Sequence, residues 1–141
     1  MNYLRYAGIV FALTVGVPFV LGLLRQLTGV NLSTAFVAIL PAIAGASIEG
    51  QKYATRHMRV PTAAETRSFV VVATLIAAGF QLALTVAVLT SVAGFPRLLL
   101  SPAMIGVMVF LAAVIAFSNM LFLRMGAKNQ LKRQNNLDVF K

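Results

Sequence analysis

Charged residues divide this chain into four long uncharged runs, and this division limits its fold more than any other feature. The runs cover Tyr6–Leu24, Gln26–Ile48, Ser68–Pro96 and Leu98–Leu123. A helix needs about 20 apolar residues to cross the hydrocarbon core of a bilayer, and each run can hold one such span. The sequence therefore predicts an all-α, polytopic membrane protein with four transmembrane helices.

The composition also favours a membrane setting. Of the 141 residues, 60% are hydrophobic and only 11% are charged, whereas soluble domains carry about 25% charged residues. A soluble fold of this length could not bury so many apolar side chains. We expect one domain covering residues 1–141, with spans at about 4–24, 32–48, 69–92 and 102–123 and a basic tail at 124–141.

Basic residues are distributed unevenly between the two predicted sides of the membrane. Ten of the twelve lie at the N-terminus, between the second and third spans, or in the tail; only Arg25 and Arg97 fall on the other side. Loops rich in Lys and Arg stay in the cytoplasm, so we expect both termini there. This asymmetry explains much of the net charge of +9. The sequence has no basic groove with interleaved aromatic residues, so we expect no nucleic-acid partner.

The first residues lead directly into an apolar run. A secretory signal has a shorter apolar core and a small-residue cleavage site, and the residues after this run, Arg25-Gln26-Leu27-Thr28-Gly29, offer no such site. We expect an uncleaved signal-anchor helix. The lack of transit-peptide features favours a bacterial inner membrane.

The longest internal polar segment covers residues 49–67. Within it, Thr62 and Glu65 have the spacing of a capping box, in which each side chain accepts a hydrogen bond from the backbone amide of the other. Pro61 keeps the preceding residue out of helical geometry. We therefore expect a helix to begin at Ala63.

One pattern in this segment resembles the central loop of an uncharacterised family of small four-span bacterial inner-membrane proteins. The pattern is Gly50-x-x-Tyr53 followed by Arg59-Val60-Pro61-Thr62-Ala63-Ala64-Glu65, and the family loop reads roughly G-x-x-[FY] and then R-x-P-T-x-x-E. The resemblance implies the same four-span topology. It implies no activity, because that family has no known function.

Small residues recur at every fourth position on the second and third predicted spans. Such stripes let helix backbones approach closely in a membrane, where dispersion drives helix association. They fit either packing within the four-helix unit or a docking face for another subunit. The helix-packing candidates are Ala38, Ala42, Ala46, Gly50, Gly79, Ala83 and Ala87.

Three polar residues near or within the spans are candidates for a role inside the membrane. We expect Glu49 to be a structural interface charge that Lys52 at i+3 neutralises; proton or cation coupling and contact with a partner's basic group are alternatives. Gln81 and Asn119 are expected to form interhelical hydrogen bonds rather than to bind a ligand.

The sequence offers no set of residues suited to catalysis or to metal binding. The chain has no cysteine and one histidine, His57, which we expect to be a solvated loop residue or a ligand of lipid phosphate. The serines have neither a G-x-S-x-G setting nor an intramembrane base. We therefore expect a non-enzymatic protein without a cofactor or a metal.

Cations on the predicted cytoplasmic side suit anionic lipid headgroups, each charge adding about 1 kcal/mol near the surface, or an acidic partner. We expect contacts with membrane lipids and with other membrane protein subunits. The residues expected to make them are Lys52, Arg56, Arg59, Arg67, Arg124, Lys128, Lys132 and Arg133.

The favoured hypothesis is a non-enzymatic accessory subunit that packs against and stabilises a larger membrane protein complex, such as a respiratory or photosynthetic one. Two alternatives stay open. One is a small homo-oligomeric transporter or channel with Glu49, Gln81 and Asn119 along its path. The other is a membrane-bound assembly factor or regulator that acts through the central loop.

Overall fold

Four α-helices make up the described part of this computed structural model, which covers residues 1–29, 35–89 and 101–138. They are α1 (Tyr3–Thr28), α2 (Ala35–His57), α3 (Ala63–Leu89) and α5 (Pro102–Asp138), and no strand occurs in those ranges. The all-helical prediction is therefore confirmed for this part of the chain. The expected span limits at residues 32 and 92, and Arg97, lie outside the described residues.

Three of the helices are long and apolar enough to cross a membrane. The segments are Tyr3–Leu27 of α1, Ala63–Ala87 of α3 and Pro102–Asn136 of α5. The shorter two have 25 residues each, which at 1.5 Å per residue extend about 38 Å. That length exceeds the roughly 30 Å of a hydrocarbon core.

The helix expected as the second span differs from the other three. Its apolar part covers residues 35–48, and a polar part from Glu49 to His57 continues the same helix. The apolar part alone extends about 21 Å, which is short of a bilayer core. The polar segment at 49–67 is thus helical as far as His57, and only residues 58–62 connect α2 to α3.

The basic tail continues α5 without interruption as far as Asp138. The helix has 37 residues and is about 55 Å long. The helix runs through Asn135-Asn136 and ends at Asp138. Asparagine costs a helix interior at most about 0.7 kcal/mol relative to alanine, so two of them do not end a helix that is stabilised elsewhere.

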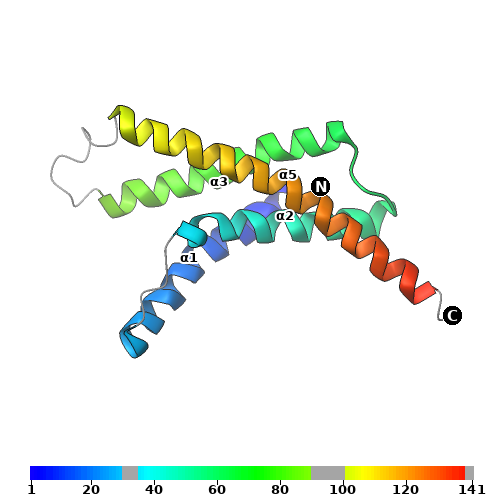
Figure 1. Ribbon diagram of the computed structural model, residues 1–141, viewed down its shortest axis with the longest axis horizontal. Helices are drawn as coiled ribbons and strands as arrows, with labels where there is room; N and C mark the ends of the chain where they lie inside the picture. Colours follow the sequence, from blue (N-terminus) through cyan, green and yellow to red (C-terminus); the bar gives the residue numbers. More distant parts are fainter. Residues whose placement is uncertain (30–34, 90–100, 139–141) are drawn as a thin grey trace.

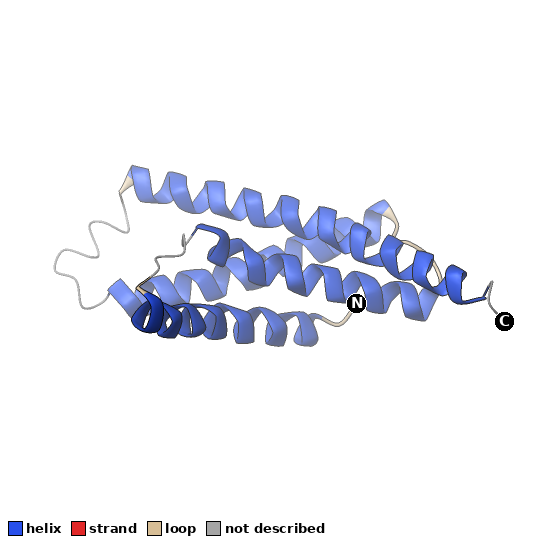
Figure 2. Ribbon diagram, turned by 60° about the horizontal axis from the view of Figure 1, so that its bottom comes forward, coloured by secondary structure: helices blue, strands red, loops and turns tan. Residues whose placement is uncertain are grey.

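The helices alternate in direction, so that both chain termini lie toward the same end of the bundle. In Figure 1, α1 and α3 run from right to left and α2 and α5 run from left to right. Figure 2 shows the same alternation from another side. At this end α1 and α3 begin, α2 ends, and α5 has its last turns. We call it the basic end.

The core lies toward the basic end and takes residues from all four helices. Tyr6 and Phe69 are fully buried, and their rings meet edge to face at 5.3 Å, a geometry that adds about 0.5–1.5 kcal/mol beyond burial. Gly45 lies against Tyr6, since an added Cβ would come within 2.8 Å of the Tyr6 ring. The other buried core residues are Val10, Ala42, Ala46, Ala73, Ala77, Ile115 and Leu123.

The second half of α1 receives little support from the other described helices. Its apolar side chains include Phe19 and Leu27, which are 68% and 81% exposed. Figure 1 shows this half of the helix diverging from α3. Among the described residues, the bundle is therefore packed more tightly toward the basic end than along the second half of α1.

Candidate functional site

Glu49 is buried and is held by the start of α1. Its side chain is 1% exposed, and its two carboxylate oxygens accept hydrogen bonds from Arg5, one from Nε and one from Nη2 at 3.0 Å. The backbone amide of Asn2 donates a third hydrogen bond at 3.1 Å. Two parallel bonds from a guanidinium are the strongest geometry for a carboxylate. Glu49 therefore fixes the start of α1 against α2.

The charge partner of Glu49 is not the expected Lys52. Lys52 is exposed, and the ion pair forms with Arg5, which lies 44 residues away in the sequence. An i, i+3 partner is favoured on an isolated helix, but Glu49 faces α1 rather than solvent. The sequence holds one signal for the observed pair, because Arg5 is the single charged residue at that end of α1.

Asn119 links three helices through a buried hydrogen-bond network. The Tyr6 hydroxyl of α1 donates to Asn119 Oδ1 at 3.0 Å, and Asn119 Nδ2 donates to the Thr74 hydroxyl of α3 at 3.4 Å. Tyr6 and Asn119 are fully buried, where an unpaired polar group costs about 1–3 kcal/mol. Asn119 thus forms the interhelical hydrogen bonds expected of it.

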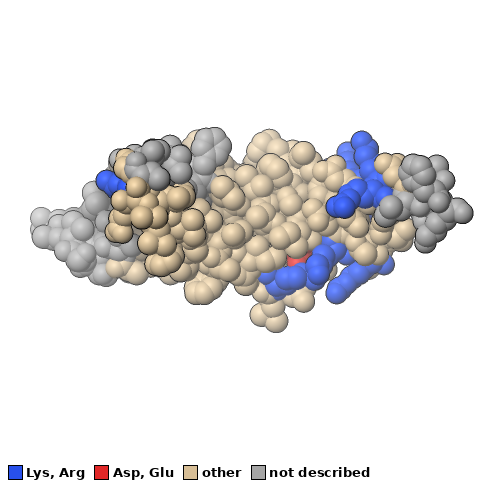
Figure 3. All heavy atoms as spheres, turned by 90° about the horizontal axis from the view of Figure 1, so that it is seen from below, with Lys and Arg blue, Asp and Glu red and all other residues tan. Residues whose placement is uncertain are grey.

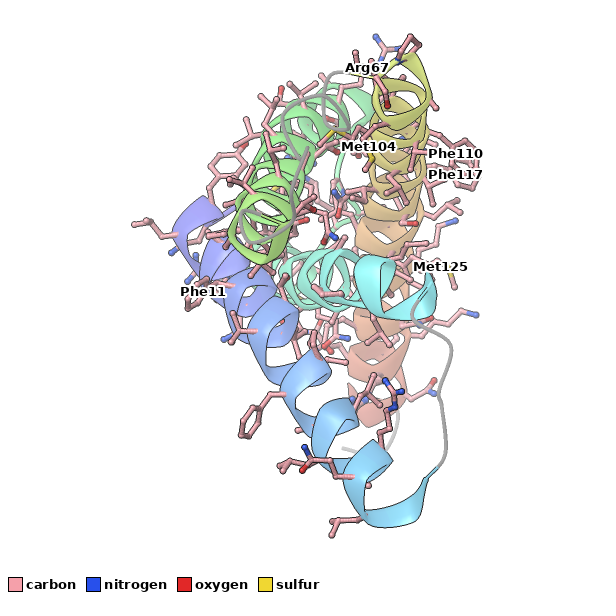
Figure 4. All side chains as sticks on the ribbon, turned by 90° about the vertical axis from the view of Figure 1, so that its left-hand side faces the viewer. Phe11, Arg67, Met104, Phe110, Phe117 and Met125 are labelled. Carbon is pink, nitrogen blue, oxygen red and sulfur yellow. The ribbon has the colours of Figure 1, made fainter. Side chains whose placement is uncertain are left out.

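Gln81 lies in a different environment from Asn119. It lines a mostly apolar pocket of about 360 Å³ between α3 and α5, and Figure 4 shows Met104 between the same two helices. Glu49 and Asn119 do not line this pocket. The three polar candidates share no pocket in the described part of the chain, so their arrangement gives no support to a transport path.

The start of α3 forms the capping box expected from Thr62 and Glu65. Thr62 Oγ1 accepts from the Glu65 amide at 3.3 Å, and Glu65 Oε2 accepts from the Thr62 amide at 2.8 Å. The helix begins at Ala63, so this prediction is confirmed. A cap of this kind contributes about 1 kcal/mol to helix stability.

The Glu65 carboxylate also binds two other polar residues of the central segment. Arg59 donates two hydrogen bonds to it, at 2.9 and 2.8 Å, and the Tyr53 hydroxyl donates one at 2.7 Å. Burial and the bond to Glu65 raise the pKa of Tyr53, and the bond to Glu65 raises the pKa of Arg59. Tyr53, Arg59 and Thr62 therefore meet around the Glu65 carboxylate, where they fix the turn between α2 and α3.

Two glycines allow α2 and α5 to cross in direct contact. A Cβ added at Gly50 would collide with the carbonyl of Leu123 on α5, and a Cβ added at Gly126 would collide with the carbonyl of Ser47 on α2. Close backbone approach of this kind is the role of small residues between membrane helices. This crossing explains why α2 and α5 stay paired beyond their apolar parts.

The small-residue stripe of α2 packs inside the four-helix unit. Ala42, Ala46 and Gly50 are all buried, and the side chain of Ala38 lies outside the described residues. Four-residue spacing on α2 does not identify the partner glycine, Gly126. The signal for it is the adjacent small pair Gly126-Ala127, which lies between the charged residues Arg124 and Lys128.

The small-residue stripe of α3 lies on the outside of the bundle. Gly79, Ala83 and Ala87 are exposed, and a Cβ added at Gly79 would meet nothing within 4 Å. Ala83 lines a hollow between α3 and α1 together with Phe11 and Phe80, whose ring centroids lie 5.5 Å apart. Gly79 and Ala83 are thus exposed small residues of an apolar α3 face that borders α1.

Seven cations at the basic end are exposed and form no ion pair with any described residue. Glu49 and Glu65 are already paired, with Arg5 and Arg59, so Arg59 is not a free lipid contact. His57 is exposed, and its ring lies 4.4 Å from that of Tyr53. Figure 3 shows Lys and Arg gathered mostly toward one end of the molecule. The seven cations are Lys52, Arg56, Arg67, Arg124, Lys128, Lys132 and Arg133.

The fold and these contacts define a small all-helical protein with three helices able to cross a membrane. Within residues 1–29, 35–89 and 101–138, no group of three His, Cys, Asp or Glu side chains could hold a metal ion. Comparison with protein-family models, curated proteins and solved structures finds no match for the chain. The resemblance to the four-span family therefore stays a prediction, and function has to be argued from geometry.

Proposed function

We propose that the chain is a multi-pass protein of the bacterial inner membrane, with both termini and the α2–α3 connection in the cytoplasm. The three long apolar helices support the membrane setting. The alternating helix directions in Figure 1 and the ten basic residues on one side support the orientation. In this topology α2 is the second of four spans and crosses the membrane with its apolar part, residues 35–48.

Introduced cysteines test this orientation, because the chain contains none of its own. Arg97→Cys is expected to react with a membrane-impermeant maleimide added outside spheroplasts. Arg133→Cys is expected to react only after the membrane is opened. Labelling of Arg133→Cys from outside, with Arg97→Cys protected, would contradict the proposed topology.

Within that membrane we propose a non-enzymatic accessory subunit that packs against a larger protein complex and stabilises it. The observation that carries this proposal is the exposed α3 face around Gly79 and Ala83. Small residues at four-residue spacing allow a second helix to approach closely, a property that contact with lipid tails does not require. The unsupported second half of α1 offers the partner a second helix to pack against.

The rest of the bundle suits a scaffold. Glu49 and Asn119 are held in fixed contacts between helices, and the α2–α5 crossing leaves no room for an added Cβ at Gly50. Helices held by such contacts keep the α3 face around Gly79 and Ala83 in one arrangement for a partner to bind. The exposed cations at the basic end add a surface for anionic headgroups or for an acidic subunit.

Ala83→Leu tests the accessory role by filling the small-residue face of α3. We expect the chain to fold normally, because Ala83 is exposed, and to leave its complex, because an enlarged side chain in a close helix contact costs about 1–3 kcal/mol. The measurement is a blue-native gel of gently solubilised membranes, in which the chain is expected to shift from a large species to a small one.

Ala113→Leu is the matched control, because Ala113 is an exposed alanine of α5 that lines none of the hollows described above. It is expected to migrate with the large species, as the unmodified chain does. The accessory role fails if the unmodified chain migrates only as a free monomer, or if both leucine variants behave alike.

A further inference from the structure

Two arginines frame a hollow between α3 and α5 at the basic end. The hollow has a volume of about 460 Å³, and its lining includes Arg67 of α3, Arg124 of α5 and the apolar side chains of Val70, Val71 and Met120. From this arrangement we propose that the hollow binds one anionic phospholipid. The phosphate lies between the two guanidinium groups, and an acyl chain follows the apolar side chains.

The two arginines stand where the polar and apolar parts of their helices meet. Arg67 directly precedes the uncharged run 68–96, and Arg124 directly follows the uncharged run 98–123. Because α3 and α5 run in opposite directions (Figure 1), these two boundary positions reach the same level and line one hollow. Lipid phosphates lie at this level when the uncharged runs occupy the hydrocarbon core.

The charges of this hollow are unbalanced within the chain. Arg67 and Arg124 are exposed, and the ion pairs of the described residues involve neither of them. Guanidinium groups bind phosphate through paired hydrogen bonds. A zwitterionic headgroup brings its own cation toward the two arginines, so a lipid with a net negative charge is favoured.

The part of the hollow that lies beside the uncharged runs suits a hydrocarbon chain rather than a second polar group. Val71 and Met120 are 60% and 40% exposed, so apolar surface is open directly below the arginines. The Thr66 hydroxyl, which also lines the hollow, already donates to the carbonyl of Thr62 at 2.8 Å. Paired cations above an apolar surface match an amphiphile better than free phosphate or an acidic peptide.

Native mass spectrometry of the purified full chain tests this site with defined lipids. The chain is delipidated in mild detergent and offered equal amounts of phosphatidylglycerol and phosphatidylcholine. We expect one phosphatidylglycerol to be retained with at least about fivefold preference, since each cation near the surface contributes about 1 kcal/mol. The double variant Arg67→Gln with Arg124→Gln is expected to weaken phosphatidylglycerol binding about 25-fold by the same estimate.

The double variant Lys128→Gln with Arg133→Gln is the control, because it removes the same charge from exposed positions of α5 that do not line the hollow. It is expected to bind phosphatidylglycerol like the unmodified chain. Equal retention of the two lipids, equal losses in the two double variants, or full displacement of phosphatidylglycerol by millimolar inorganic phosphate would each overturn the site. The two lipids are compared on the unmodified chain, so this part of the test does not depend on whether the variants fold.

Discussion

Arg5→Ala is expected to lower the free energy of unfolding by about 3–5 kcal/mol, because it leaves the Glu49 carboxylate buried without a counter-charge. The Glu49 side chain is 1% exposed while Arg5 is present, so its charge is compensated by Arg5 rather than by solvent. The measurement is thermal unfolding in mild detergent, followed by the far-ultraviolet circular dichroism of the helices. Arg25→Ala, which removes an exposed arginine of the same helix, is expected to change stability by less than about 0.5 kcal/mol.

A second substitution separates the lost attraction from the unpaired charge. Arg5→Ala combined with Glu49→Gln is expected to be more stable than Arg5→Ala alone, since no unpaired charge remains in the core. If Arg5→Ala and Arg25→Ala unfold at the same temperature, the pair between Arg5 and Glu49 does not hold α1 in place.

Gly50→Ala is expected to destabilise the chain by about 1–3 kcal/mol, because the added methyl group collides with the Leu123 carbonyl and forces α2 and α5 apart. The colliding atom belongs to the backbone of α5, so no side-chain rotation can relieve the contact. The same unfolding measurement detects the loss. Separation of α2 and α5 is also expected to speed hydrogen exchange of backbone amides around Gly126.

Gly8→Ala is the matched control for this substitution. Gly8 lies within α1, and an added Cβ would meet nothing within 4 Å. Alanine is favoured over glycine in a helix by about 0.8–1 kcal/mol, so Gly8→Ala is expected to leave stability unchanged or to raise it. A Gly50→Ala variant as stable as Gly8→Ala would contradict the close crossing of α2 and α5.

Features that depend on neighbouring residues could be predicted from the sequence. The start of α3 at Ala63 follows from Thr62 and Glu65, because a capping box is satisfied within one turn. The apolar runs indicated the three long helices for the same reason, since length and hydropathy are properties of a single segment. These features needed no knowledge of how the helices pack.

Features that depend on packing could not be predicted in the same way. The pairing of Glu49 with Arg5 joins two helices that are far apart in the sequence, and spacing along one helix pointed to Lys52 instead. The continuation of α2 past Glu49 to His57 coincides with this contact. The continuation of α5 past Arg124 likewise coincides with the contact between Gly126 and α2.

The two small-residue stripes show a related limit of sequence patterns. Four-residue spacing marks Gly50 and Gly79 equally, yet Gly50 is buried against α5 and Gly79 is exposed. Spacing shows that a helix face can be approached closely, and only the arrangement of the helices shows whether the same chain covers it. The exposed stripe of α3 is therefore the feature on which the proposed accessory role depends.

Native mass spectrometry of the unmodified chain, extracted from its own membrane with mild detergent, tests that role most directly. The chain has a mass of 15.1 kDa. The proposed function predicts an assembly whose mass is larger than that of this chain and is not a whole multiple of it, and which releases the chain intact on activation. Detection of only the single chain, or of whole multiples of 15.1 kDa, would contradict the proposed function.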